Sequence, residues 1–365
     1  MTELLLASTL VLAFANGAND NIKGAATLYG CGGLDYRGAL TLGTVSVALG
    51  SLASIFVATA LVRAFTAKGL VPDALLDARF LAAVATGAAL TVLAATRIGM
   101  PISTTHALLG ALAGAGVVVA GSELDGAALA RGFALPLLLS PLLAVGLAVA
   151  GIWTGRRASR ALGPEPDACL CVSARAPEAV HAGAAALRVR AEPGIALQRG
   201  TAESCPVHGL RIERAGLERA VDWGHLLSAS LVGFARGLND TPKILGLLVG
   251  GAVLAPVPGA LCIAVAMAAG GLVAARRVAG TMAHRMTPMT PSEGLAGNLS
   301  TSLLVVGASR LGVPVSTTHV SCGGIFGIGL SNGELRVQAA RQVLVAWLTT
   351  LPVAALLAAG AMALL

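Results

Sequence analysis

Two short motifs that contain anion-binding and cation-binding residue types each occur twice in the chain. The first reads Gly-Ala-Asn-Asp-Asn-Ile-Lys at 17–23 and Gly-Leu-Asn-Asp-Thr-Pro-Lys at 237–243. The second reads Pro-Ile-Ser-Thr-Thr-His at 101–106 and Pro-Val-Ser-Thr-Thr-His at 314–319. The copies come in the same order at offsets of 220 and 213 residues, which indicates an internal repeat. We call them the ND motif and the STTH motif.

The ND motif places a carboxylate and an ammonium group inside an apolar segment. Asp20 is followed three residues later by Lys23, and Asp240 by Lys243, so that on a helix each pair shares a face. Ionised groups are costly in a bilayer unless they are paired or hydrated. A purely structural ion pair between helices is the alternative, but two copies at mid-segment favour one central site between two repeats. Arg236, immediately before the second copy, has no assigned role.

The residues around each Asn-Asp pair predict a break in the helix. Gly17 and Gly237 precede the asparagines Asn19 and Asn239 and permit such a break. In the second copy, Pro242 suits the first turn of a restarted helix, with Thr241 as its cap. A broken helix exposes backbone N–H groups, whose positive end can face an anion.

The STTH motif supplies hydroxyl groups where a helix is expected to begin. Pro101 and Pro314 can each open a short helix. The hydroxyls that follow are those of Ser103, Thr104, Thr105, Ser316, Thr317 and Thr318. Hydroxyls and free N–H groups at a helix N-terminus make an oxyanion cradle, although Ser and Thr also bond back to their own helix.

His106 and His319 follow the hydroxyls in both copies. One interpretation is that they carry a coupling proton, because His titrates near physiological pH. The other is that they are neutral helix residues bonded to a neighbour.

A polar triplet precedes only the second STTH motif. Asn298, Ser300 and Thr301 have the apolar counterparts Ala85, Gly87 and Ala88 in the first half. This asymmetry predicts a site for a coupling cation, and hydrogen bonding between helices is an equally open alternative.

Cysteine and histidine residues in the central polar stretch are candidate metal ligands. Cys169, Cys171, Cys205 and His208 could bind zinc tetrahedrally. Their spacing fits no common zinc finger, so free cytosolic thiols are the alternative.

The composition predicts helices that cross a bilayer. Of the 365 residues, 56% are hydrophobic and only 12% are charged, against about 25% charged residues in soluble domains. The fold class is therefore predicted as all-α, a polytopic membrane protein. Apolar segments lie at about 4–30, 39–63, 80–97, 100–121 and 132–153 in the first half and about 224–252, 255–275, 291–311, 313–331 and 341–364 in the second.

The segments predict two membrane repeats, 1–154 and 223–365, joined by a polar loop at 155–222. The composition of this loop favours partial disorder, with a small domain as the alternative. If all five segments of a half cross, the second repeat is inverted; the STTH segments could instead re-enter. Lys and Arg lie mainly in the loop and at the segment ends on its side, which predicts that the loop is cytoplasmic. The net charge of +7 thus reflects orientation and not nucleic-acid binding.

The motifs resemble those of the inorganic phosphate transporter (PiT) family, the bacterial-type phosphate permeases. The matching stretches read FANGANDN at 14–21, PISTTHALLGA at 101–111, GLNDTPK at 237–243 and NLSTSLLVVGASRLGVPVSTTH at 298–319. The resemblance covers both membrane halves and not the central loop. It implies a Na⁺/phosphate or H⁺/phosphate symporter with inverted repeats, in which Asn19, Asp20, Asn239, Asp240 and both Ser-Thr-Thr runs face the substrate or a coupling ion.

One departure from the family pattern concerns the coupling ion. The family motif commonly has a second Asn where Lys23 and Lys243 stand. An ammonium group cannot coordinate Na⁺. We therefore hypothesise that both lysines contribute to anion binding in place of bound Na⁺, and that transport is Na⁺-independent and H⁺-coupled.

Together these features predict a transporter and not an enzyme. The predicted activity is phosphate symport by alternating access in the cytoplasmic membrane, with the bilayer and phosphate as partners and no cofactor beyond Na⁺ or H⁺. Phosphate keeps a P–OH proton that a carboxylate accepts, so a site with Asp favours phosphate over sulfate. Transport of sulfate, an anion channel and a membrane sensor are the alternatives. The sequence leaves open whether the protein forms a homo-oligomer.

Overall fold

The computed structural model describes residues 1–57, 59–66, 71–129, 135–162, 168–174, 178–182, 186–190, 195–201 and 210–365. These residues form two compact units: residues 1–152 with 225–365, and residues 153–224. We call the first the helical unit and the second the insert.

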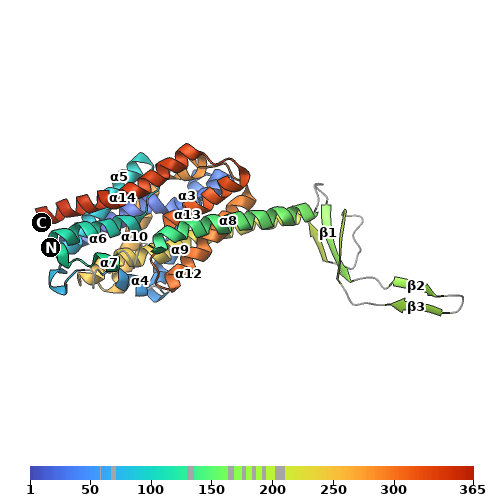
Figure 1. The fold of residues 1–365 in the computed structure, drawn as a ribbon, viewed down its shortest axis with the longest axis horizontal. Coiled ribbons are helices and arrows are strands. Elements are labelled where there is room, and N and C mark those ends of the chain that lie inside the picture. Colours follow the sequence, from blue (N-terminus) through green and yellow to red (C-terminus); the bar gives the residue numbers. More distant parts are fainter. Residues whose placement is uncertain are drawn as a thin grey trace. The chain divides into compact units, whose positions relative to one another are not determined.

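The first half of the helical unit follows the order of the predicted segments (Figure 1). Its main helices are α1 (Thr2–Asp20), α3 (Tyr36–Val57), α5 (Ala78–Ile98), α6 (Thr104–Ala120) and α8 (Leu135–Leu162). Shorter elements are the 3₁₀ turn η1 (Asn21–Gly24), α2 (Ala26–Gly30), α4 (Thr59–Ala64), η2 (Asp73–Leu75), η3 (Gly121–Glu123) and α7 (Gly126–Leu129).

The second half repeats this order. Its main helices are α9 (Arg214–Gly250), α10 (Pro256–Ala274), α12 (Pro291–Arg310), α13 (Thr317–Asn332) and α14 (Val337–Leu364). The short α11 (Arg276–Gly280) and the π-helical turn η6 (Thr281–Arg285) follow α10. Both chain termini lie at the same end of the helical unit in Figure 1.

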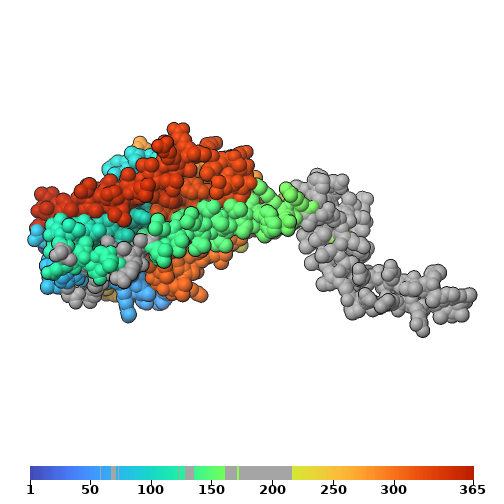
Figure 2. Space-filling view, viewed as in Figure 1, coloured from blue at the N-terminus to red at the C-terminus, as the bar shows by residue number. Residues whose placement is uncertain are grey.

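The helical unit has the dimensions and surface of a membrane protein. Five described helices, α3, α5, α8, α10 and α14, are long and apolar enough to cross a bilayer. Side chains such as Leu138 and Leu142 on α8, and Leu348 and Leu356 on α14, are more than half exposed, and these helices cover the face seen in Figure 2. Arg236, by contrast, is among the largest fully buried side chains. The prediction of a helical, multi-pass membrane protein is therefore confirmed.

The two STTH helices are shorter than the other main helices. α6 has 17 residues and α13 has 16, so each is about 25 Å long. This is less than the roughly 30 Å of a bilayer's hydrocarbon core. Each helix would need the extended segment before it to reach across the membrane.

Glycines let helices of the two halves approach closely. Four of the closest approaches form two pairs related by the 220-residue offset. A Cβ on Gly17 would lie 1.8 Å from the Met267 carbonyl oxygen, and a Cβ on Gly237 would lie 2.0 Å from that of Val47. A Cβ on Gly270 would lie 1.9 Å from the Phe14 carbonyl oxygen, and a Cβ on Gly50 would lie 1.9 Å from that of Phe234. Any larger side chain would overlap the neighbouring backbone. Helix α1 of the first half thus packs on α10 of the second half. In the same way, α9 of the second half packs on α3 of the first half.

The insert contains strands that the sequence analysis did not predict. They are β1 (Ala168–Ala174), β2 (Glu178–Ala182), β3 (Ala186–Arg190), β4 (Ile195–Thr201) and β5 (Leu210–Glu213). β1 pairs antiparallel with both β4 and β5, and β2 pairs antiparallel with β3. The all-α prediction is confirmed for the helical unit, whereas alternating residues in the insert, such as those of Leu210–Glu213, form strands.

Candidate functional site

The ND motif adopts different backbone structures in its two copies. α1 passes through Gly17 and ends at Asp20, where the η1 turn begins. α9 is continuous through Gly237 and contains Pro242 in its interior. The predicted break at Gly17 is therefore wrong by a few residues, and the predicted restart at Thr241 is wrong. Both glycines instead permit the close helix packing described above.

The STTH motif begins a helix in both copies, as predicted. Ser103 caps α6, and its Oγ accepts a hydrogen bond of 3.1 Å from the His106 backbone N–H. Ser316 caps α13 in the same way, with a 3.1 Å bond from the His319 N–H. A side-chain cap satisfies one of the N–H groups that a helix start leaves unpaired. The threonine hydroxyls therefore lie in the first turn of each helix.

The ammonium group of Lys23 lies in a cage of four oxygen atoms. Its Nζ donates to Asn19 Oδ1 at 2.7 Å, to the Ile102 carbonyl at 3.1 Å and to Thr318 Oγ1 at 2.7 Å. It also forms an ion pair with the carboxylate of Asp20. Thr318 belongs to the second half, so this lysine joins the two halves.

Lys243 has the matching environment in the second half. Its Nζ donates to Thr105 Oγ1 at 2.8 Å, to the Val315 carbonyl at 2.9 Å and to Asp240 Oδ1 at 3.2 Å. The side-chain oxygen of Asn239 is the fourth acceptor. Each lysine thus contacts the STTH motif of both halves, and the predicted substrate-binding residues of the two repeats meet at one place.

The asparagines of the ND motif support the approach to each STTH motif. Asn19 Nδ2 donates to Thr96 Oγ1 at 2.9 Å and to the Met100 carbonyl at 3.1 Å. Asn239 Nδ2 donates to Ser309 Oγ at 2.8 Å. These bonds hold the ends of α5 and α12 against the motif helices.

The two aspartates differ in the donors that surround them. The groups near Asp20 are Lys23 Nζ, Arg236 Nη1 at 3.3 Å, Thr318 Oγ1 at 3.1 Å, Asn16 Nδ2 at 2.9 Å and Thr104 Oγ1 at 3.2 Å. Among the described residues, Asp240 accepts only from Lys243 and from Thr317 Oγ1 at 3.1 Å. A carboxylate has about four hydrogen-bond acceptor positions. Those of Asp20 are taken up by its neighbours, whereas Asp240 can still accept further hydrogen bonds.

Arg236 is a component of this site that the sequence analysis left without a role. Its side chain is 1% exposed. Nη1 donates to Thr317 Oγ1 at 3.1 Å, and Nη2 donates to the Thr317 carbonyl at 3.2 Å and to Ser321 Oγ at 2.6 Å. A basic residue beside a repeated motif within an apolar segment was the signal that could have identified it.

The histidines of the two STTH motifs lie next to each other. The ring centroids of His106 and His319 are 4.3 Å apart, and those of His319 and Trp347 are 3.8 Å apart. Trp347 Nε1 donates to the Pro101 carbonyl at 3.2 Å. Within the described part of the chain, His106 Nδ1 and His319 Nε2 have no hydrogen-bond partner. Their role as proton carriers stays a prediction.

The polar triplet of α12 bonds mainly within its own helix. Ser300 Oγ and Thr301 Oγ1 donate to the Gly297 carbonyl at 2.8 and 2.9 Å. Asn298 Nδ2 donates to Thr27 Oγ1 at 2.9 Å. Among the described residues, these side chains form no hydrogen bond with the lysines or aspartates of the ND motif. Their role at a coupling-ion site stays a prediction.

The predicted zinc ligands lie in the insert. Cys205 and His208 lie outside the described residues, and the side chain of Cys169 is likewise not described. Cys171 is disulfide-bonded. Because zinc binds thiolates, a zinc site that includes Cys171 would require this disulfide to be reduced.

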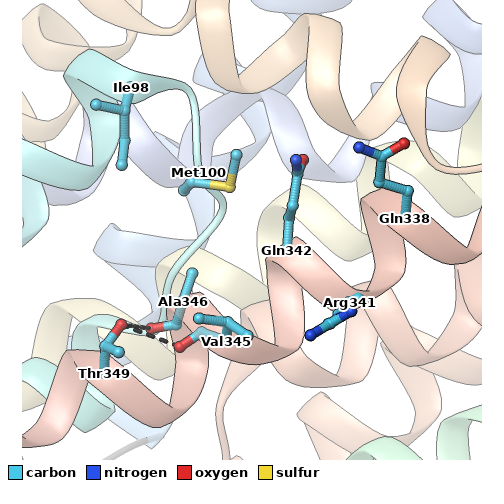
Figure 3. Close-up of a pocket in the computed structure, with 8 residues that line it drawn as sticks. All are labelled: Ile98, Met100, Gln338, Arg341, Gln342, Val345, Ala346 and Thr349. Atoms are coloured by element: carbon cyan, nitrogen blue, oxygen red, sulfur yellow. Dashed lines mark hydrogen bonds between the residues drawn. The ribbon is translucent and has the colours of Figure 1, made fainter.

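A hollow of about 550 Å³ lies beside the first STTH motif. Figure 3 shows its lining: Ile98 at the end of α5, Met100 in the segment that follows it, and Gln338, Arg341, Gln342, Val345, Ala346 and Thr349 from α14. Met100 also accepts, through its carbonyl, the hydrogen bond from Asn19. The hollow therefore adjoins the segment that leads into the motif, and its described lining includes no ND or STTH residue.

Comparison with known proteins places these features in a family. The model of the family described as "Phosphate transporter family" matches residues 16–358. A "Probable low-affinity inorganic phosphate transporter" of Mycobacterium bovis is 28% identical over 369 residues, covering 98% of this chain and 75% of the relative. "Inorganic phosphate transporter 2-1, chloroplastic" of Arabidopsis thaliana is 27% identical over 428 residues, covering 98% and 71%.

A solved structure has the same fold. It is named "The sodium-dependent phosphate transporter", and it matches this chain with a TM-score of 0.77 at 19% identity. The match covers 100% of this chain and 98% of that chain.

Proposed function

The chain belongs to the phosphate transporter family, and from that premise we propose that it carries inorganic phosphate across the cytoplasmic membrane as a symporter. The observation that carries the proposal is the charged site in the interior of the helical unit. Lys23, Asp20, Arg236, Lys243 and Asp240 are all no more than 3% exposed. Buried charges in a membrane protein mark a path for ions or substrate.

Alternating access between two inverted repeats is the proposed mechanism. The reciprocal glycine contacts at the 220-residue offset support a two-fold relation between the halves. So do the lysine cages, because each joins an ND motif to the STTH motif of the other half. A site shared by two repeats can open to either side when one repeat tilts against the other.

The chemistry of the site favours an oxyanion. Hydroxyls of Thr104, Thr105, Thr317 and Thr318 lie at the N-terminal turns of α6 and α13, and cationic side chains lie among them. Helix N-termini and hydroxyls bind oxyanions, while Asp240, with acceptor capacity left, can receive the P–OH of phosphate and would repel sulfate.

We propose that protons, and not Na⁺, are the coupling ions. Each lysine ammonium occupies an oxygen cage of carboxylate, amide, hydroxyl and carbonyl groups, which is the ligand set that a hard cation would use. A fixed ammonium there leaves no place for bound Na⁺. The adjacent His106 and His319 are candidates to carry the proton.

Radiolabelled phosphate uptake into proteoliposomes tests the proposal, with Na⁺ and pH gradients imposed separately. We expect saturable uptake driven by the proton gradient in the wild type and none in Asp240→Asn. Uptake driven by Na⁺ alone would leave phosphate transport standing and contradict proton coupling. Non-saturating flux would indicate a channel, and the absence of phosphate movement under both gradients would overturn the function and make sulfate the next substrate to test.

A further inference from the structure

Arg236 breaks the symmetry between the two halves of the site. At the 220-residue offset, its counterpart in the first half is Asn16. Asn16 Nδ2 donates to Asp20 Oδ2 and to Thr104 Oγ1, both at 2.9 Å, and Arg236 donates to Thr317 in the same relation. An asparagine therefore suffices to hold an STTH threonine, and the positive charge of Arg236 needs a separate explanation.

The charge of Arg236 has no carboxylate of its own. Lys23 pairs with Asp20 and Lys243 pairs with Asp240, each three residues apart on its motif. Arg236 shares Asp20 Oδ1 with Lys23, at 3.3 Å. In the described part of the site, three cationic side chains thus face two carboxylates. A buried charge without compensation is strongly unfavourable, so the site as a whole calls for one further negative charge.

The guanidinium also has an unused donor. Nη1 and Nη2 donate to Thr317 and Ser321 at the start of α13, whereas Nε has no partner among the described residues. A buried donor without a partner is costly. In addition, the N-terminal end of a helix carries partial positive charge and repels a cation. An anion between Arg236 and the first turn of α13 would accept from the unpaired Nε donor and would offset the repulsion between the guanidinium and the helix end.

We propose that Arg236 is the residue whose charge pairs with the transported anion, and that its bond to Asp20 is the contact it makes when no anion is bound. The inference rests on the proposed function and adds to it the anion's cationic partner. Guanidinium groups match two oxygens of a phosphate at once. Asp20 can release Arg236 because Lys23, Asn16 and Thr104 remain in contact with it.

Equilibrium binding of radiolabelled phosphate to the purified full-length protein tests the inference. Arg236→Asn copies the first half, where Asn16 stands, and should weaken phosphate binding by about 10- to 100-fold. Arg236→Lys keeps the charge but loses the parallel N–H donors of the guanidinium, and should weaken phosphate binding less than Arg236→Asn. If Arg236→Asn does not fold, the phosphate affinities of the wild type and Arg236→Lys still test whether the parallel N–H donors of the guanidinium bind the anion.

Asp20→Asn separates this role from a structural one. If Arg236 binds the anion, Asp20→Asn should weaken phosphate binding clearly less than Arg236→Asn does, because loss of Asp20 frees Arg236 from this bond. If the Asp20–Arg236 pair has only a structural role, loss of either residue should weaken phosphate binding to a similar extent. Equal weakening in Asp20→Asn and Arg236→Asn, or wild-type affinity in Arg236→Asn, would overturn the inference.

The wild type provides the test of the underlying function in the same assay. If it binds sulfate and not phosphate, and Arg236→Asn loses sulfate binding, the phosphate proposal fails while the role of Arg236 stands. If the wild type binds neither anion, both fail.

Discussion

The first copy of the ND motif lies at the end of a helix, whereas the second lies within one. α1 ends at Asp20, but α9 continues beyond Asp240 to Gly250. The lysines nevertheless occupy the same kind of oxygen cage in both copies. The comparison teaches that the side-chain spacing within the motif, and not the form of the backbone, is what the two halves share.

The surroundings of the two aspartates differ more than the motifs themselves. Asp20 contacts two cations, Lys23 and Arg236, while among the described residues Asp240 contacts a single cation, Lys243. We infer that Asp20 is mainly a counter-ion inside the protein and that Asp240 is the carboxylate that meets the substrate. Four predictions test this division, from the largest expected effect to the smallest.

Asp240→Asn should reduce phosphate uptake by about 100-fold or more, because it removes the carboxylate that has capacity to accept the P–OH of phosphate. Initial uptake rates in proteoliposomes measure this. Asp222→Asn is the matched control, since Asp222 is exposed on the same helix, and it should transport normally. Retention of more than about half of the wild-type rate by Asp240→Asn would show that Asp240 is not the substrate's carboxylate.

Lys243→Met should destabilise the protein more than Lys23→Met, although the two changes are chemically identical. Loss of Lys243 leaves Asp240 buried with no cation, which costs about 3–5 kcal/mol. After loss of Lys23, Arg236 still contacts Asp20, so the cost should be smaller. Thermal unfolding of both purified variants in the same detergent measures the difference; equal melting temperatures would contradict the unequal surroundings of the aspartates.

Gly17→Ala and Gly237→Ala should destabilise the protein to a similar extent, by about 1–3 kcal/mol each. Their new methyl groups would meet the Met267 and Val47 carbonyls at 1.8 and 2.0 Å. Gly360→Ala is the control, because beyond the neighbouring backbone of its own helix no atom lies within 4 Å of its Cβ position, and it should melt like the wild type or slightly higher. A clear difference between Gly17→Ala and Gly237→Ala would argue against equivalent helix packing in the two halves.

The double variant Lys23→Asn, Lys243→Asn should acquire stimulation by Na⁺ that the wild type lacks. The change removes both ammonium groups and leaves carboxylate, hydroxyl and carbonyl oxygens, which are ligands for a hard cation. Phosphate uptake with Na⁺ or K⁺ outside, at equal pH on both sides, measures it. Na⁺ stimulation of the wild type that is unchanged in the variant would refute the hypothesis that the lysines replace Na⁺.

Sequence reasoning predicted those parts of the site that depend on near neighbours in the chain. Asp20 and Lys23 pair because residues three apart share a helix face, and Ser103 caps α6 because its side chain reaches an N–H in the next turn. The predicted break at Gly237 is wrong because the glycine is needed for a contact outside its own helix, where it packs against the backbone of Val47. The strands of the insert were missed because its polar composition was interpreted as favouring disorder.

By itself, the sequence determined that the chain forms membrane-embedded helices, that its anion-binding residue types occur in two copies, and which residues pair within a turn. Only the tertiary structure decided that Lys23 reaches Thr318, that Lys243 reaches Thr105 and that Arg236 shares Asp20. The physical reason is that hydrogen-bond spacing within a helix follows from its fixed geometry. Contacts between residues far apart in the chain depend instead on how closely helices pack, which here is set by glycines facing the backbone of the other half.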